Sequence, residues 1–420
     1  MNKTGVYKLV HLTSEGEYKT PLVASQLFDQ AEWQAVVKDG FAPQKVEVWI
    51  VGSFREYFEE SAKSKIESLR KRCPHISVKM INGIGRLKNF PIMNLLSANR
   101  SKLGKDVPVI YHCRGEWAAQ WALKLRKLFP LDKVVLDVRG YWPAESIYRY
   151  GIDDPSVASG ANLVEYNAAL AFLKSTIEQV DSVTTVSNEL KSLLIAEVSA
   201  PADTSVVPCC VSEIVADTQR GEFRKSWGVS DDEILLVYSG GTASYQHLED
   251  LTIPFLKLLA AKNAKIKLVF FSSELEKIKL MLQNAGMNTD DIILKSYAQK
   301  EVGYALTACD AGILIRKPTL VNRVANPVKI AEYLAAGLPV IIEKGVGGVS
   351  KELFERSLMK SIEISLSPEM SKAAEDIQSW ISEVKSQRQA VKEYARQYYL
   401  WSTAIHVSRK MYSKVLGNDA

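Results

Sequence analysis

Short apolar segments alternate with amphipathic helical segments through the second half of the chain, and this pattern restricts the fold more than any other feature. Strands are predicted at residues 234–239, 266–272, 292–294, 311–315 and 339–342. Helices are predicted between them at about 245–261, 274–284, 300–309 and 327–336. Continuously apolar strands separated by amphipathic helices are typical of a parallel sheet that helices cover on both faces. We therefore predict a Rossmann-like domain here.

The first half shows the same alternation with more interruptions. Strands are predicted at residues 45–53, 76–83, 107–115 and 133–140, and residues 181–194 indicate a strand followed by a helix that Ser187 caps. Residues 199–212 contain two prolines and small polar residues, which are typical of a linker. We expect an α/β chain of two Rossmann-like domains that face a cleft, the first spanning residues 1–200 and the second residues 201–389.

Length and composition agree with two globular domains. The chain has 420 residues, of which 47% are hydrophobic and 24% charged, so it is neither disordered nor fibrous. No apolar run approaches the roughly 18 residues that a membrane-spanning helix needs. The first residues lack the apolar core of a signal peptide, and the five scattered cysteines favour reduced thiols. We expect a cytoplasmic protein.

Positive charge is concentrated in residues 61–105, which hold 11 basic side chains and a single acid, Glu67. Residues 86–105 interleave such bases with apolar side chains, including Leu87 and Phe90. This combination predicts an element that docks peripherally on an anionic membrane surface, at its inner face. The alternative is a solvated helix whose apolar side belongs to the first-domain core. Nucleic acid is not expected as a partner, because no recognition module is visible.

The segment NPVKIAEYLAAGLP (326–339) predicts a short helix with a binding role. Asn326 is expected to cap it and Pro327 to begin its first turn. Lys329 and Glu332 are three residues apart and share its polar face. The lysine and the free N–H groups of a helix start suit a phosphate, and the carboxylate suits a ribose diol. The structural alternative is a surface ion pair between these two residues.

A second phosphate-binding signal is Gly240-Gly241, which follows a predicted strand and precedes a predicted helix. Glycines at this position let the backbone approach a pyrophosphate, although most such pairs are only turns. The sequence contains neither G-x-G-x-x-G nor a P-loop, which disfavours kinase-like and NAD-type phosphate sites.

Two loops of the first half carry candidate working residues at predicted strand ends. His112 and Arg139 are candidates for catalysis, and Arg114 and Glu145 for binding the hydroxyls or phosphate of an acceptor. Structural alternatives are equally open: Arg139 would pair with Glu145, Arg114 would pair with Glu116, and His112 would be a histidine at the end of a strand.

Taken in order, several segments resemble the retaining glycosyltransferases of the GT-B fold, the large family-four group. The segments are VDSVTTVSNEL (180–190), VVPCCVS (206–212), LLVYSGG (235–241), CDAGILI (309–315), NPVKIAEYLAAGLPVI (326–341) and YYLWSTAIHVSRKMYSKVL (398–416). The fifth is similar to a P-x-K-x-x-E-Y-x-A-x-G variant of the group's strongest motif. In that fold the closing helix, here about residues 390–420, crosses back onto the first domain.

The resemblance implies that the second domain binds a nucleotide-sugar donor. Lys329 and the helix start near Asn326 would hold the diphosphate, Glu332 the ribose, and Gly240-Gly241 would give the phosphates room. This chain departs from the group in two places. Val324 stands where the first acid of an E-x7-E pair belongs, and residues 242–248 (TASYQHL) lack the usual basic pair of the glycine loop. Arg316, Lys317 or Arg323 would supply the missing positive charge.

The resemblance implies a hexosyltransferase-type enzyme that moves a sugar from a nucleotide-sugar to a glycan or a polyprenyl-diphosphate-linked acceptor. Bacterial envelope polysaccharide synthesis is the setting that the resemblance implies. Retention is implied by resemblance alone. No cofactor is expected, and no metal, because D-x-D is absent. Two alternatives stay open: a non-catalytic protein that binds a nucleotide-sugar, and a GT-B nucleotide-sugar epimerase.

Overall fold

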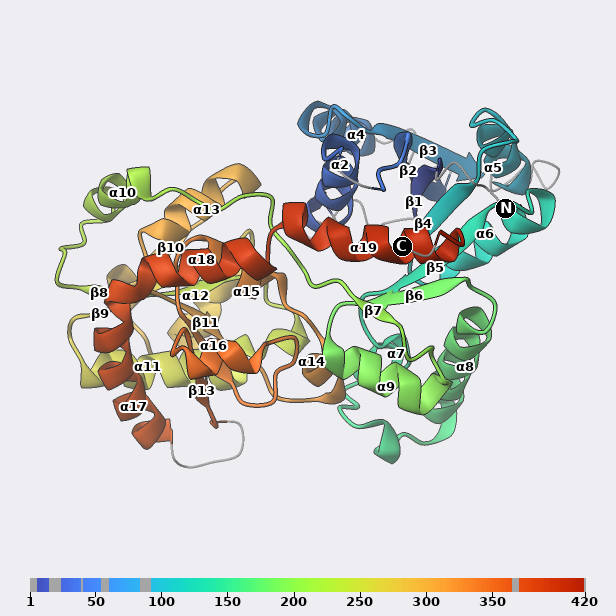
Figure 1. Cartoon of the computed structure of the whole chain (residues 1–420). Helices are drawn as coiled ribbons and strands as arrows, with labels where there is room; N and C mark the ends of the chain where they lie inside the picture. Colours follow the sequence, from blue (N-terminus) through green and yellow to red (C-terminus); the bar gives the residue numbers. More distant parts are fainter. Residues whose placement is uncertain are drawn as a thin grey trace. The chain divides into compact units, whose positions relative to one another are not determined.

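The computed structural model describes residues 6–14, 24–38, 41–53, 60–83, 92–364 and 370–418. The chain divides into two compact units (Figure 1). The first unit comprises residues 1–212 and 401–420, and the second comprises residues 213–400. Two α/β units with parallel sheets confirm the predicted fold class.

The first unit is built on a parallel sheet whose described strands follow the order β3-β2-β1-β4-β5-β6-β7. The strands are β1 (Lys8–Thr13), β2 (Lys45–Ser53), β3 (Ser77–Gly83), β4 (Val109–Arg114), β5 (Lys133–Val138), β6 (Ser182–Thr185) and β7 (Ser205–Val206). Its helices are α2 (Asp29–Val36), α4 (Glu60–Arg72), α5 (Ile92–Ser101), α6 (Glu116–Leu128), α7 (Trp142–Tyr148), α8 (Gly160–Ile177), α9 (Asn188–Val198) and α19 (Trp401–Val415).

The second unit is built on a parallel sheet with the order β10-β9-β8-β11-β12-β13. The strands are β8 (Ile234–Ser239), β9 (Ile266–Phe271), β10 (Ile293–Lys295), β11 (Ala311–Leu314), β12 (Val340–Glu343) and β13 (Met359–Ile362). Its helices are α10 (Arg220–Ser226), α11 (Ile253–Lys262), α12 (Leu275–Asn284), α13 (Gln299–Thr307), α14 (Leu320–Val324), α15 (Val328–Ala335), α16 (Lys351–Glu355), α17 (Met370–Val384) and α18 (Arg388–Tyr398). Every predicted strand of this half is present.

The division into units falls after Ser212, where the sequence predicted a boundary after residue 200. Residues that were expected to form a linker instead pack in the first unit. Strand β7 pairs with β6, and the amide N–H of Cys210 donates to Gln26 Oε1 at 3.1 Å. These contacts tie residues 205–210 to the first sheet.

The helical tail divides between the two units at Leu400. Helix α18, which was expected to belong to the crossing helix, stays with the second unit, because Arg388 donates to the carbonyl of Ala336 at the end of α15. Helix α19 belongs to the first unit. Its fully buried Trp401 donates from Nε1 to the carbonyl of Ser25 at 3.1 Å, and Met411 and Tyr412 join the core around β1 and β2.

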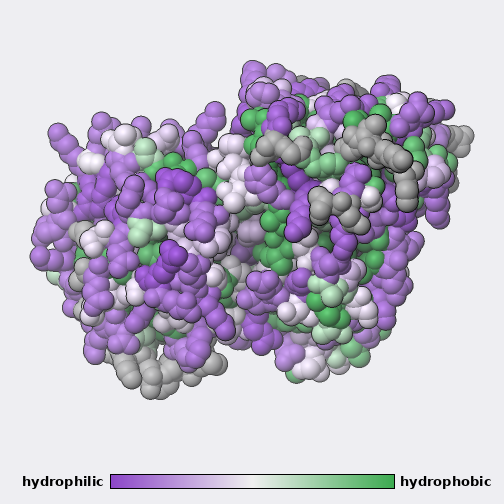
Figure 2. All heavy atoms as spheres, in the orientation of Figure 1, coloured by the Kyte–Doolittle hydropathy of each residue, from purple (hydrophilic) through white to green (hydrophobic). Residues whose placement is uncertain are grey.

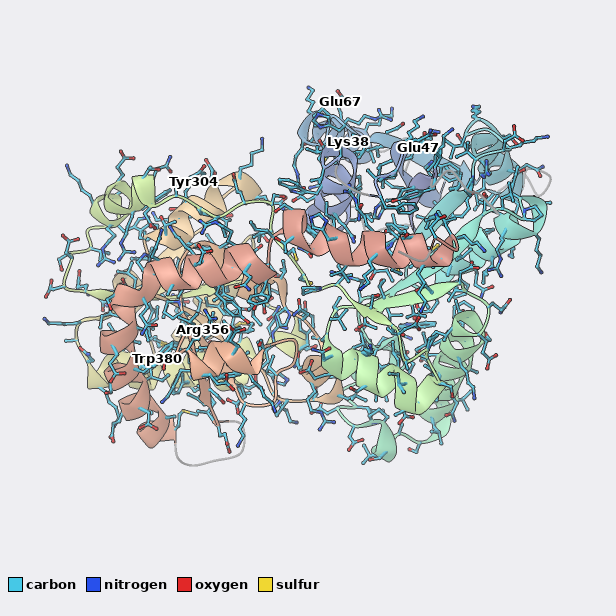
Figure 3. The ribbon with its side chains drawn as sticks, viewed as in Figure 1. Lys38, Glu47, Glu67, Tyr304, Arg356 and Trp380 are labelled. Atoms are coloured by element: carbon cyan, nitrogen blue, oxygen red, sulfur yellow. The ribbon has the colours of Figure 1, made fainter. Side chains whose placement is uncertain are left out.

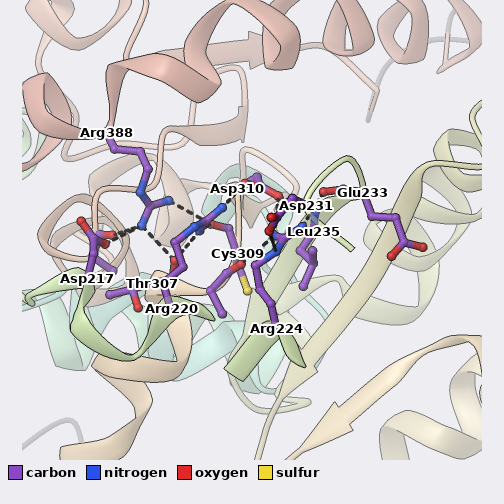
Figure 4. A network of polar contacts seen from close by, with 12 residues as sticks. Asp217, Arg220, Arg224, Asp231, Glu233, Leu235, Thr307, Cys309, Asp310 and Arg388 are labelled. Carbon is purple, nitrogen blue, oxygen red and sulfur yellow. Dashed lines mark hydrogen bonds and ion pairs between the residues drawn. The ribbon is translucent and has the colours of Figure 1, made fainter. Parts of the chain in front are cut away.

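At the amino end of each sheet, a buried aspartate joins a strand start to an arginine. In the first unit Asp132 accepts from Val109 N at 3.0 Å and from two nitrogens of Arg100, both at 2.6 Å. In the second unit Asp310 accepts from Leu235 N at 2.9 Å and from Arg224 at 3.2 Å (Figure 4). A buried carboxylate is stable only when hydrogen-bond donors satisfy it. These bonds therefore hold the amino ends of the strands in place in both units.

The visible surface is mainly hydrophilic, with hydrophobic residues in small groups (Figure 2). In the described part of the chain, none of the helices has the length and apolar character needed to cross a bilayer. The five cysteines are all buried and free, which agrees with the predicted reduced thiols.

Candidate functional site

The strand order of the second sheet defines where a ligand belongs. Strands β8 and β11 are neighbours, although the chain passes from β8 to β9 on one side and from β11 to β12 on the other. In open parallel sheets, ligands bind beside the carboxyl ends of the two strands where the order reverses in this way. Gly240 directly follows β8, and Arg316 lies two residues beyond β11.

The glycine loop is held by hydrogen bonds from three directions. The N–H of Gly240 donates to Phe271 O at 3.0 Å, and the hydroxyl of Tyr238 donates to Gly241 O at 2.6 Å. The carboxylate of Glu274 accepts from Thr242 N at 2.8 Å and from Thr242 Oγ1 at 3.0 Å. Sequence reasoning missed Glu274, because no local pattern connects the end of β9 with this loop.

The segment after the glycine loop differs from the single helix that was predicted from about residue 245. A short 3-10 turn covers Ser244–Gln246, His247 adopts a left-handed conformation with φ of 48°, and a π-helical stretch at Leu248–Thr252 leads into α11. The loop therefore does not open directly onto a helix N-terminus. His247 instead contacts Asp250 through Nδ1 at 2.7 Å.

Arg316 lies at the same edge of the sheet, where only 6% of it is exposed. Its guanidinium carbon is 5.3 Å from the ring centre of Tyr245, which is a cation–π geometry. Its charge also reaches the hydroxyl of Tyr238 in the glycine loop, whose pKa burial nevertheless raises. Arg316 is thus built into the wall of the candidate site.

Helix α15 begins one residue later than predicted, and Asn326 does not cap it. The Asn326 amide instead donates from Nδ2 to Gly348 O at 2.7 Å. Gly347 and Gly348 follow β12, and a side chain at either position would collide with the backbone of residues 323–326. The turn before α15 is therefore fixed by a glycine pair that sequence reasoning did not single out. The predicted helix stop is correct, since Gly337 has a left-handed φ of 77°.

Tyr333 attaches α15 to the two strands of the crevice. Its hydroxyl accepts from Ser239 N at 2.9 Å, at the end of β8, and donates to Ile313 O of β11 at 3.3 Å. A Cβ on Gly312 would lie 2.4 Å from the Tyr333 ring, so this close approach requires glycine. The helix is thereby held against the carboxyl ends of β8 and β11.

Lys329 and Glu332 form the ion pair that was one of the two predicted readings, with Nζ and Oε2 2.8 Å apart. Each side chain is 24% exposed, so both charges face solvent on the polar side of α15. The structure thus gathers Gly240, Gly241, Arg316, Lys329 and Glu332 on elements that meet at the crevice edge. Val324 is buried in α14.

In the first unit, His112 lies inside β4 and is 1% exposed. Its Nδ1 is 2.9 Å from the Tyr412 hydroxyl of α19, and its Nε2 is 3.6 Å from Asp137 Oδ2. His11 of β1 lies beside it, with ring centres 5.0 Å apart and the ring planes tilted by 45°. Burial and the neighbouring His112 hold the pKa of His11 well below its usual range. His112 therefore belongs to a packed polar cluster under α19.

Arg139 pairs with Asp137, with Nη1 and Oδ1 3.7 Å apart, and not with Glu145 as the structural alternative supposed. It also contacts Val207 O at 3.3 Å, Gln26 Oε1 at 3.4 Å and Cys209 Sγ at 3.2 Å. Burial favours the neutral form of Asp137, but the charges of Arg139, His112 and Arg114 outweigh it and hold its pKa far below the usual range. Two arginines thus converge on one buried carboxylate.

Glu145 lies in the first turn of α7 and folds back over Gly140, where a Cβ would meet its Oε1 at 2.0 Å. The carboxylate keeps part of its surface open to solvent, yet the surrounding protein atoms desolvate it and raise its pKa. Arg114 ends β4 in the adjacent strand and is partly exposed. The structure thus brings Arg114, Arg139 and Glu145 to the carboxyl end of the first sheet.

The basic segment 61–105 is partly used inside the first unit. The buried Glu47, which is labelled in Figure 3, pairs with Lys79 at 2.7 Å. Arg72 pairs with Asp29, and Arg100 is the buried partner of Asp132. Ile66 and Leu69 of α4 pack in the core. Within residues 86–105, for which a helix with a core-facing apolar side was the alternative, Leu96 of α5 is buried. Residues 84–91, which include Leu87 and Phe90, lie outside the described residues.

Comparison with known proteins agrees with this geometry. Residues 219–398 match the model of the family described as "Glycosyl transferases group 1". These residues lie within the second unit. No curated protein matches the chain in a sequence search.

Solved structures match over nearly the whole chain. A glycosyltransferase from Rickettsia africae has a TM-score of 0.68 at 12% identity, covering 98% of this chain and 99% of its own. HepE of Anabaena, solved in complex with UDP-glucose, has a TM-score of 0.63 at 12% identity, covering 97% and 99%. WaaG, a glycosyltransferase involved in lipopolysaccharide biosynthesis, has 0.60 at 12% identity, with the same coverage. The chain therefore has the GT-B fold.

Proposed function

Because residues 219–398 match the glycosyl transferases group 1 model and the chain has a GT-B fold, we propose that this protein transfers a sugar from a nucleotide-sugar to an acceptor. The second unit would bind the donor, and the first unit the acceptor. The observation that carries the proposal is the position of Lys329 and Glu332, which Tyr333 fixes at the reversal point of the sheet inside the matched domain.

The chemistry at this edge suits departure of a nucleoside diphosphate. Glycosyl transfer places new negative charge on the leaving diphosphate, and preorganised positive groups lower the barrier to that step. Lys329 of α15 would bind the diphosphate. Arg316, which follows β11, would add a second positive charge. The Glu332 carboxylate would then accept hydrogen bonds from the ribose hydroxyls, and Gly240 and Gly241 would admit the phosphates close to the backbone. Asn326 would hold the helix start in place.

The type of donor sugar, the stereochemistry and the acceptor are proposed from the chemistry of the first unit and from the structural neighbours. We propose a hexosyl donor, retention of configuration, no metal ion, and an acceptor that is a glycan or a lipid-linked cell-envelope precursor. HepE was solved with UDP-glucose, and WaaG is involved in lipopolysaccharide biosynthesis. Both neighbours support this assignment. Arg114 and Glu145 would contact the acceptor. His112 and Arg139 would shape the catalytic side of the first unit.

We also propose that the protein is cytoplasmic. Residues 61–105 would attach it peripherally to the inner face of the membrane. The exposed bases Lys63, Arg70 and Lys71 of α4 support it, since α4 turns its apolar side chains into the core and leaves these charges outside. Flotation with anionic liposomes tests this part: binding that salt weakens is expected, and equal recovery with neutral liposomes would contradict it.

The first test of function is thermal stabilisation by nucleotides. A ligand that binds only the native state raises the melting temperature with its concentration. We expect one of UDP, GDP, ADP or CMP, or a matching nucleotide-sugar, to stabilise the wild type and to lose its effect in Lys329→Ala and Glu332→Ala. Lys262→Ala is the matched control, because Lys262 also pairs with a carboxylate, Glu375, at 2.7 Å.

Turnover separates the proposal from the two alternatives. A glycosyltransferase releases nucleoside diphosphate in proportion to acceptor, an epimerase converts its nucleotide-sugar without an acceptor, and a binding protein does neither. Nucleotide binding without release of diphosphate, across a panel of glycan and lipid-linked acceptors, would replace this proposal with the binding-protein reading.

A further inference from the structure

Two neighbouring loops of the first unit repeat one short pattern. Arg114-Gly115-Glu116-Trp117 follows β4, and Arg139-Gly140-Tyr141-Trp142 follows β5. Each reads R-G-x-W, with the arginine near the strand end and the tryptophan at the start of the next helix. The two strands are paired in parallel, with Arg114 opposite Asp137. The repeat therefore places two arginines and two tryptophans side by side at the carboxyl end of one sheet.

The glycines of the two turns are needed for different reasons. Gly115 has a left-handed φ of 80° and lets α6 begin directly after β4. Gly140 leaves room for the carboxylate of Glu145, which a side chain there would displace. Glu145 is three residues after Trp142 and lies on the same side of α7. The second turn thus presents a carboxylate beside its indole.

The aromatic side chains of the two turns form an open cluster. The rings of Trp117 and Trp142 are 6.5 Å apart, and Phe172 of α8 lies 4.8 Å from Trp117 and 6.0 Å from Trp142. Trp117 remains 58% exposed, whereas the other seven tryptophans, all of them in the described ranges, are buried or half-buried. An indole supported by two rings and left open on one side is a platform for a flat apolar surface.

The charges around this platform leave no surplus of positive charge. Arg114 and Arg139 stand beside three acids, Asp137, Glu116 and Glu145, and Arg139 already pairs with Asp137. Such a set disfavours a phosphate, which would need surplus positive charge. Guanidinium donors and carboxylate acceptors around an aromatic surface instead suit a ligand with many hydroxyls, because few well-placed polar groups orient a ligand on an apolar wall.

We propose that the paired R-G-x-W turns are an acceptor subsite for an uncharged sugar ring. The ring lies on Trp117, and Arg114 and Glu145 bind its hydroxyls. This inference rests on the proposed function and adds the acceptor class to it: a neutral glycan end rather than a phosphate-bearing one.

The experiment measures sugar binding to the whole protein without donor, by saturation-transfer NMR and tryptophan fluorescence. The probes are uncharged methyl hexosides and disaccharides, each beside a phosphorylated counterpart such as glucose 6-phosphate. We expect saturable binding of at least one uncharged probe, with affinity falling about tenfold in Trp117→Ala, the equivalent of about 1.4 kcal/mol. Trp117→Phe retains an aromatic face and should recover most of the affinity. Arg114→Ala should weaken the same probe.

Leu280→Ala is the control, because Leu280 is a similarly exposed apolar residue (57%) on α12 of the second unit; it should leave binding unchanged. Equal affinity in Trp117→Ala and wild type would overturn the subsite, as would tighter binding of every phosphorylated probe or no binding of any uncharged one. Failure of the proposed function is a separate result. It would appear as absent release of nucleoside diphosphate, while donor-free sugar binding remains measurable.

Discussion

The two units share one strand order and differ in what they place at the ends of the strands. In both sheets the first six strands run 3-2-1-4-5-6, counted within each unit. At the amino ends the units agree, since Asp132 with Arg100 and Asp310 with Arg224 each secure a strand start. At the carboxyl ends they diverge: the second unit exposes Lys329 and Glu332, whereas the first buries His112 and Asp137 under α19.

This difference separates what maintains the fold from what determines its use. The buried aspartate–arginine pairs recur because any parallel sheet of this kind must satisfy the backbone groups at its strand starts. The carboxyl ends are free to vary, because they open into loops where side chains can meet ligands. Two sheets with the same order of their first six strands can therefore serve different ligands. The carboxyl end of the second sheet suits a nucleotide, and that of the first sheet suits another ligand.

The largest expected effect is on donor use at the second carboxyl end. Lys329→Ala should lower kcat/KM by about 100-fold, because one charged hydrogen bond to a diphosphate contributes about 1.5–3 kcal/mol. Steady-state release of nucleoside diphosphate measures it. Lys262→Ala removes a comparable paired lysine and should stay within about twofold of wild type. Equal losses in both variants would mean that Lys329 acts only through the stability of its helix.

At the amino ends we expect similar, large losses of stability in the two units. Arg100→Ala leaves Asp132 without its cation, which costs about 3–5 kcal/mol. Asp310 pairs with both Arg220 and Arg224, so the double variant Arg220→Ala/Arg224→Ala is the matching change in the second unit. Urea denaturation followed by circular dichroism checks this. Arg356→Ala removes an exposed arginine that pairs with Glu352 (Figure 3) and should cost less than about 1 kcal/mol. If one of the two buried pairs proved as weak as this control, the amino ends would no longer be equivalent.

At the first carboxyl end, the burial of His112 leads us to expect a change in stability before a change in chemistry. Tyr412→Phe removes the hydroxyl 2.9 Å from His112 Nδ1 and should lower the free energy of unfolding by about 1 kcal/mol. His112→Asn should also lower the melting temperature. A His112→Asn variant that melts like wild type but has lost kcat would instead support the catalytic role that the sequence predicted.

The smallest expected effect is a change in stability with pH that comes from Glu145. Desolvation raises its pKa above the usual carboxyl value, so the folded protein holds this proton more tightly than the unfolded chain does. Stability from this group is therefore present at low pH and lost as pH rises through the raised pKa. Glu145→Gln should melt like wild type below pH 4 and slightly higher at pH 7. Greater stability of wild type at pH 7 would show that the carboxylate gains a compensating partner.

Much of the fold was predictable because its signals are local. Strands β8 to β12 of the second unit were found from apolar runs, whereas β13 was not predicted. Ser187 caps α9 as predicted, accepting from Leu190 N at 3.0 Å. Strand β1 was not predicted, because KLVHLT is short and mixes apolar with polar residues. The irregular start of the helix after Gly241 was also not predicted, because no residue type there indicates a π-helical stretch.

The sequence by itself determined the α/β class, the helix at Lys329 and Glu332 with its glycine stop, and the polar loops at strand ends. These follow from periodicity and from the conformations that single residues allow, which neighbours along the chain decide. Only the tertiary structure decided that Asn326 bonds to Gly348 instead of capping α15, that Glu274 holds Thr242, and that Tyr412 covers His112. Such bonds join residues 22 to 300 positions apart, and their partners are chosen by strand order and packing, which no local pattern contains.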